Sequence, residues 1–461
     1  MARVALIGLD GVPPALLFGS WRAALPVLDA LCRAGAYRTL WSCVPPITVP
    51  AWSCMLSSQD PGQLGVYGFR NRTDHSYAGL RVATSRDIRV PRVWDLLSRA
   101  GGRSVVIGVP GTYPPPVING LLVADFLTPS VDSAFTCPGT ARARVLDLEP
   151  GYRFDVTGFR RRDEDSLVAD VTAMTQRRFR LARALAAEPW DFFALHEIGT
   201  DRLHHRLFPQ RVDELADDET AARLLAYYRV LDAEIGLLLD TLPPDTRVVV
   251  ASDHGARAMR GGVRINRWLI DHGYLRLRTG VPVSAATAET IDWDRTVAWG
   301  EGGYYARVYL NIAGREPRGT LPAGRVPSLL AELRDGLGGI RGNDDRRMAT
   351  TARTPADLYR AQRGIPPDLL VLFDGLACRS IGTLAGDEVF TTENDTGIDI
   401  ANHSMDGVLV VHGADVNLSG DAVGGVAEPE LYDVAPTILD LLGLSVPETM
   451  IGRSLLGRRP G

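Results

Sequence analysis

The stretch VALIGLDG at residues 4–11 is a short apolar run that ends in Asp10 and a glycine. A continuous apolar run of this length, rather than an alternating one, is typical of a strand covered on both faces of a sheet. Similar runs follow at 104–109, 191–196, 247–252, 368–373 and 407–412. Amphipathic stretches typical of helices separate them, at 26–34, 93–100, 219–239 and 431–442. Strands that alternate with helices predict an α/β fold with a mostly parallel central sheet flanked by helices.

The segment 262–367 differs from its flanks. It begins with a helical pattern at 265–273 and continues as a stretch punctuated by glycine and arginine. Apolar runs like those of the first half resume at 368. We therefore expect an inserted, cap-like subdomain at 262–367, carried by a core formed from 1–261 and 368–461.

Composition limits the partners and the compartment. The chain has 461 residues, 45% of them hydrophobic and 23% charged, with a net charge of -5, which is the usual balance of a globular protein. No window approaches the ~18 apolar residues of a membrane helix, and the first residues lack the basic region and cleavage site of a signal peptide. The charges are mixed, without a basic stripe. We expect a cytoplasmic protein without a membrane or nucleic-acid partner.

Two residue types restrict the chemistry. The chain contains no lysine, which excludes Schiff-base chemistry, attachment of pyridoxal phosphate and a P-loop. Any cationic clamp on a phosphate must then be an arginine, and the sequence does not single one out. The cysteines are odd in number and scattered without a CxxC pair, so they predict neither a disulfide framework nor a zinc ribbon. They are Cys32, Cys43, Cys54, Cys137 and Cys378.

Acidic residues and histidines gather where apolar runs end. Asp10 follows the first run, and Asp253 and His254 follow the run 247–252. Ligands of open α/β sheets bind at the carboxyl ends of the strands, so these side chains are candidates to meet there. Polar residues at a buried strand end are costly unless they are paired or bind a metal. Asp201 and His205 are four residues apart and would share one helix face.

Each of these residues also has a plainer interpretation. An Asp after a strand is commonly a helix N-cap, and a pair such as Asp201 and His205 also arises by chance. We expect the remaining histidines outside these motifs to be ordinary surface or core residues. They are His75, His196, His272 and His412.

A hydroxyl group completes the constellation. Thr48 lies in the proline-rich stretch PPITVPAW at 45–52, and residues 51–58 have the pattern of a short helix. This would bring the Thr48 hydroxyl close to a helix N-terminus, where backbone N–H groups favour a phosphate. A purely structural proline-rich loop is the alternative.

Taken together, the motifs resemble the alkaline phosphatase superfamily, and specifically its type I phosphodiesterase/nucleotide pyrophosphatase-like branch. The resemblance spans residues 1 to about 455. It rests on motifs that occur in the order of that branch. These are GLDG at 8–11, the Thr48 turn followed by PGQLGVY at 61–67, TDRLHH at 200–205, SDHG at 252–255, NHSMDG at 402–407 and LYDVAPTI at 431–438.

The resemblance implies an alkaline phosphatase-like fold and two adjacent divalent metal ions, zinc or alternatively manganese. Histidine with carboxylate ligands suits both metals. The implied ligands of the first ion are Asp10, Thr48, Asp253 and His254. Those of the second are Asp201, His205 and His403, with His204 either a residue that supports the ligands or a bystander.

The resemblance also implies a reaction. Thr48 would attack phosphorus and form a phospho-threonine, so that a phosphodiester or phosphomonoester of a small metabolite or nucleotide is hydrolysed. A phosphomutase with the same intermediate is the alternative enzyme. A sulfatase is a further one, since Cys43 begins a sulfatase-like pattern that has Ile47 where arginine is expected. A binding protein on the same scaffold would be expected only if a ligand position were lost. The sequence identifies neither the substrate nor the oligomeric state.

Overall fold

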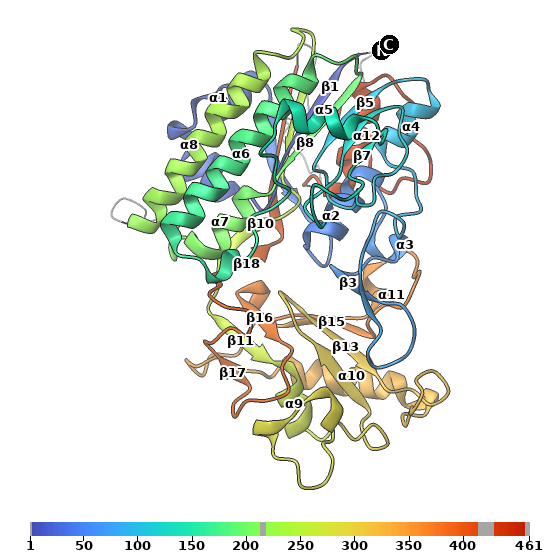
Figure 1. Cartoon of the computed structure of the whole chain (residues 1–461). Helices are drawn as coiled ribbons and strands as arrows, with labels where there is room; N and C mark the ends of the chain where they lie inside the picture. The colour runs from blue at the N-terminus through green and yellow to red at the C-terminus, as the bar shows by residue number, and fades with distance from the viewer. Residues whose placement is uncertain (1, 213–217, 414–427, 457–461) are drawn as a thin grey trace. The chain divides into compact units, whose positions relative to one another are not determined.

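The computed structural model describes residues 2–212, 218–413 and 428–456. The chain forms two compact units (Figure 1). The first consists of Met1–Phe69, Ala83–Ala256 and Ser404–Gly461, and the second of Arg70–Val82 and Arg257–His403.

The first unit is built on an eight-stranded sheet with a parallel centre. Its strand order is β2-β19-β9-β1-β8-β5-β6-β7. The five strands from β9 to β6 pair in parallel, whereas β2, β19 and β7 pair antiparallel at the two edges. In chain order the bounds are β1 Val4–Leu9, β2 Ala36–Trp41, β5 Ser104–Ile107, β6 Gly120–Val123, β7 Thr136–Cys137, β8 Phe192–Glu197, β9 Arg247–Ala251 and β19 Asp406–His412. The predicted α/β fold with a mostly parallel sheet is confirmed.

Helices cover this sheet (Figure 1). The group α1, α6, α7 and α8 packs together, and α12 packs against α2 and α4. Aspartate side chains cap the N-termini of the two longest helices. Asp163 accepts a hydrogen bond from the Ser166 amide at the start of α6, and Asp218 accepts one from the Thr220 amide at the start of α8. No helix among the described residues is long and apolar enough to cross a membrane. The helices are α1 Pro26–Ala34, α2 Thr48–Ser57, α3 Pro61–Leu64, α4 Val93–Arg99, α5 Ala141–Leu148, α6 Glu164–Ala186, α7 Gly199–Leu207, α8 Glu219–Leu239 and α12 Val434–Leu441.

The second unit has its own core beneath an antiparallel sheet of order β12-β13-β15-β14. Its strands are β12 Ala298–Glu301, β13 Ala306–Leu310, β14 Thr351–Arg353 and β15 Leu369–Leu372. A three-stranded sheet adds β11 Gly261–Arg264, β16 Cys378–Ile381 and β17 Phe390–Thr391, and the main helices are α9 Ile265–Asp271 and α10 Val326–Leu337. The hairpin of β3 Arg70–Arg72 and β4 Leu80–Val82 also belongs to this unit.

The unit boundaries differ from those we expected. The second unit contains the expected insertion 262–367, extends it to 257–403 and adds residues 70–82. The apolar run 368–373 is a strand, β15, but it pairs antiparallel with β13 and β14 and not with the main sheet. An apolar run predicts that a strand is buried, and does not identify the sheet that buries it.

One glycine of β1 allows a helix to approach the sheet. A Cβ atom on Gly8 would lie 2.3 Å from Cη2 of Trp52, which is fully buried on α2. The indole of Trp52 therefore occupies the space that a side chain at position 8 would fill.

We predict that Gly8→Ala destabilises the protein by about 1–3 kcal/mol, because the added methyl group overpacks this contact. Urea unfolding followed by circular dichroism measures the change. Gly139→Ala is the control, since a Cβ atom there meets nothing within 4 Å. Equal effects of the two substitutions would contradict the packing argument.

Candidate active site

Three neighbouring parallel strands supply the acidic side chains of the candidate site. β1 lies between β8 and β9 in the sheet. Asp10 follows β1, Asp253 and His254 follow β9, and Asp201 lies on α7, which comes after β8. The site is therefore at the carboxyl edge of the sheet, where an open α/β sheet binds its ligands.

The first group of candidate ligands is Asp10, Asp253 and His254. One ligand atom of each lies within 4.8 Å of the others, and all three residues are fully buried. Nε2 of His254 is 3.3 Å from Oδ2 of Asp253 and 3.6 Å from Oδ1 of Asp10. The Gly11 amide donates to Oδ1 of Asp253. Two carboxylates and an imidazole at this spacing form a donor set that suits zinc or manganese.

Thr48 lies beside this group. Its hydroxyl donates to Oδ1 of Asp10 across 3.5 Å. Helix α2 begins at Thr48, three residues earlier than the helical pattern indicated, and the N-cap residue Ile47 provides no side-chain cap. The hydroxyl is thus at a helix N-terminus, as predicted, where backbone N–H groups favour an anion.

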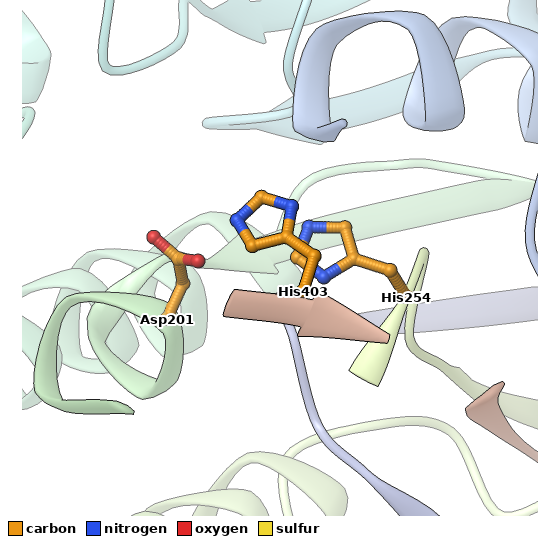
Figure 2. A group of neighbouring side chains, drawn as sticks. All are labelled: Asp201, His254 and His403. Carbon is orange, nitrogen blue, oxygen red and sulfur yellow. The ribbon is translucent and has the colours of Figure 1, made fainter. Parts of the chain in front are cut away.

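The second group of candidate ligands is Asp201, His254 and His403, whose ligand atoms lie within 4.8 Å of one another (Figure 2). His403 belongs to β18 Ala401–Ser404, which pairs with β10 Gly255–Ala258 directly after His254. His205 adjoins the group, with Nε2 3.3 Å from Oδ1 of Asp201. His254 thus takes part in both groups, whereas the family resemblance implied it as a ligand of the first ion alone.

His204 points to a different partner. Its Nε2 is 2.9 Å from the Tyr228 hydroxyl of α8, and its ring packs edge-on against Phe208. Burial lowers the pKa of His204 to about 3, so the ring is neutral. These contacts agree with a packing role for His204 and leave His205 as the histidine beside Asp201.

Two residues that contact Asp10 were not among the site residues predicted from the sequence. Nε2 of His196 is 2.8 Å from Oδ2 of Asp10, and Nε1 of Trp52 donates to the same oxygen at 3.0 Å. His196 is buried, which agrees with the prediction of an ordinary surface or core histidine, and it also contacts Asp10. The β1–β8 register pairs His196 with Gly8, so the glycine that admits Trp52 also lies beside this histidine. A glycine inside a buried strand was the available signal, because it marks a close approach.

Burial and crowding set the electrostatics of the site. Burial, followed by the repulsion of Asp201, raises the pKa of Asp10 to about 7. Burial, followed by the charge of Asp10, raises the pKa of Asp253 well above its usual range. Burial, followed by the charge of Arg178, lowers the pKa of His196 to about 3 and keeps that ring neutral. Carboxylates that disfavour each other's ionisation in this way ionise together only where positive charge lies nearby, and a divalent cation is one source of such charge.

The fold of this chain is that of known hydrolases. It is similar to human ectonucleotide pyrophosphatase/phosphodiesterase 5, with 13% identity, a TM-score of 0.57 and coverage of 99% of this chain and 100% of the other. It is similar to phosphonoacetate hydrolase from Sinorhizobium meliloti 1021 solved with phosphonoformate, with 14% identity, a TM-score of 0.59 and coverage of 96% and 95%. It is also similar to an inactive threonine-to-alanine variant of the murine phosphodiesterase 5 solved with AMP, with 12% identity, a TM-score of 0.55 and coverage of 97% and 96%.

The sequence itself identifies the family. The family model of type I phosphodiesterase/nucleotide pyrophosphatase matches residues 4–385. The chain belongs to this family, whose members hydrolyse phosphoric ester bonds. No curated protein matches it.

We predict that the metal-free protein loses stability as the pH rises from about 4 to about 7. The folded-state pKa of Asp10 is about 7, above the ordinary 3.8, so the native state binds a proton that the unfolded state has released. Divalent cations bind the deprotonated carboxylates and should restore stability most strongly at the upper end of this range. Urea unfolding at several pH values, with chelator or with zinc, measures both effects. A chelated protein that gains stability over this interval would contradict the prediction.

Proposed function

We propose that this protein is a metal-dependent phosphohydrolase that cleaves a phosphodiester, or a phosphomonoester, of a small metabolite or nucleotide through a phospho-threonine intermediate. The observation that carries the proposal is the Thr48 hydroxyl, 3.5 Å from Oδ1 of Asp10 at the start of α2 and beside a buried group of acids and a histidine. The family match supports the class of reaction.

The residues that would hold two divalent cations, zinc or manganese, are those that the family resemblance implies. Asp10, Thr48, Asp253 and His254 would bind one cation, and Asp201, His205 and His403 the other. When bound, such cations lower the pKa of a coordinated hydroxyl and offset the negative charge of a phosphate.

The residues of the chain determine the course of the reaction. Asp10 orients the Thr48 hydroxyl, which gives up its proton to bulk water and attacks phosphorus in line with the leaving group. The bond from Oγ1 to phosphorus forms while the bond to the ester oxygen breaks. The leaving oxygen takes a proton from bulk water, so the leaving group departs as an alcohol. Water then attacks the phospho-threonine, releases the phosphoryl group and regenerates Thr48. His196 and Trp52 keep Oδ2 of Asp10 engaged, so Oδ1 faces the hydroxyl.

The structurally similar proteins support this proposal. Two carry small ligands, AMP in the murine protein and phosphonoformate in the bacterial one. The murine variant that is inactive lacks a threonine, which agrees with a threonine nucleophile. We therefore propose small phosphate or phosphonate compounds as the substrate class here.

We also propose a cytoplasmic location. The five cysteines are free thiols, and four of them are buried. Unbridged cysteines are typical of proteins in a reducing compartment.

Three chromogenic esters test the proposed reaction. The purified protein is incubated with bis(4-nitrophenyl) phosphate, 4-nitrophenyl phosphate and 4-nitrophenyl sulfate, with and without chelator. We expect turnover of a phosphate ester that chelation abolishes and zinc or manganese restores. Turnover of the sulfate alone would indicate a sulfatase. No turnover of any of the three esters would contradict the hydrolase proposal and would favour a phosphomutase or a binding protein.

Substitution of Thr48 tests the nucleophile. Thr48→Ala should lower turnover by about 10³-fold or more, because no hydroxyl remains to attack phosphorus. Its metal content, measured by mass spectrometry of the eluted ions, should stay close to that of the wild type. Thr48→Ser is the matched control and should retain measurable turnover. An active alanine variant would exclude Thr48 as the nucleophile.

A further inference from the structure

Arg202 connects Asp201 to a second acidic residue. Its Nη1 donates to Oδ2 of Asp201 at 2.6 Å, and its Nε and Nη2 donate to the two carboxylate oxygens of Asp155, each at 2.9 Å. All three nitrogens of the guanidinium therefore bind carboxylates. Only 9% of the Arg202 side chain is exposed.

Aromatic rings restrict the same guanidinium. It lies 5.2 Å from the ring centre of Phe126 and 4.9 Å from that of Phe159. The Phe159 ring also contacts His205, with 5.8 Å between the ring centres. Arg202 thus has little freedom to change its rotamer, and the orientation of Asp201 follows from that of Arg202.

We propose that Arg202 and Asp155 are positioning residues that fix Asp201 as a cation ligand. The inference rests on the proposed function, because it takes Asp201 as a ligand of the second cation. Arg202 engages Oδ2 of Asp201 and leaves the carboxylate oriented with Oδ1 toward His205. Asp155 offsets the charge of Arg202, so the pair acts on the site by geometry more than by added charge.

The contacts of Arg202 differ from those expected of an arginine that binds a substrate phosphate. The missing lysines leave arginine as the cation for such a clamp, and Arg202 is next to the site. A clamp presents its paired N–H groups to the substrate. In Arg202 the paired N–H groups are directed to Asp155, and the remaining nitrogen bonds Asp201.

Zinc titration against a chromophoric competing chelator tests the proposal, because it measures the affinity of each cation without any substrate. The variants are Arg202→Lys, Arg202→Gln, Asp155→Asn and the double variant Arg202→Gln/Asp155→Asn. The control is Arg183→Lys, which alters the ion pair of Arg183 with Glu234 between α6 and α8. Arg183 lies in the last turn of α6, which leads into the start of β8, whereas Asp201 follows the other end of that strand.

We expect Arg202→Gln to lower the affinity for one of the two cations by about 10–100-fold and to leave the affinity for the other unchanged. Arg202→Lys keeps the charge but not the three contacts, so its loss should be smaller. Asp155→Asn should lower the affinity for the same cation. The double variant should bind that cation no more weakly than Arg202→Gln alone, because both residues act through Asp201. Arg183→Lys should bind both cations as the wild type does.

Four results would overturn the inference. Unchanged affinity for both cations in Arg202→Gln would show that Asp201 does not depend on Arg202. An equal loss of affinity for both cations in Arg202→Gln, together with a lower melting temperature, would show that Arg202 has a general structural role. A raised KM for the phosphate ester at unchanged zinc affinity would make Arg202 a substrate clamp. A wild-type protein that binds no divalent cation would overturn both this inference and the proposed function, whereas the first three results leave the proposed function intact.

Discussion

The structure depends on placing three carboxylates, those of Asp10, Asp201 and Asp253, together in a buried position. Burial and mutual repulsion raise the pKa values of Asp10 and Asp253, so the site in its ionised form requires compensating positive charge. Proteins retain such an unfavourable arrangement mainly where it serves a function. Neighbouring side chains hold two of these carboxylates in place, since His196 forms a hydrogen bond with Asp10 and Arg202 donates one to Asp201.

Much of the fold could be predicted from the sequence, since apolar runs and amphipathic periods are local properties. The run 4–9 is β1 with the predicted bounds, and the stretches 26–34 and 219–239 are α1 and α8 with theirs. Strand partners could not be predicted in the same way. The runs 368–373 and 407–412 are strands, but β15 pairs in the second unit and β19 pairs antiparallel in the first. Pairing is decided by contacts distant in sequence, which a local pattern does not encode.

The candidate site shows the same division. Asp10, Asp253 and His254 could be recognised because each follows a buried strand, and the rule for open sheets brings strand ends together. The supporting residues could not, because their roles depend on strand register and on rotamers. His196 contacts Asp10 through the pairing of β8 with β1, and Arg202 resembles any other arginine of a helix until Asp155 is known to lie beside it. Gly8 carries the one local sign of this packing.

Anomalous diffraction at the zinc absorption edge, from crystals of the full chain grown with zinc, shows whether the buried carboxylates hold two cations. We expect two peaks close together, one among Asp10, Asp253 and His254 and the other at Asp201 and His403. Crystals of catalytically active protein with no peak at these side chains would contradict this expectation.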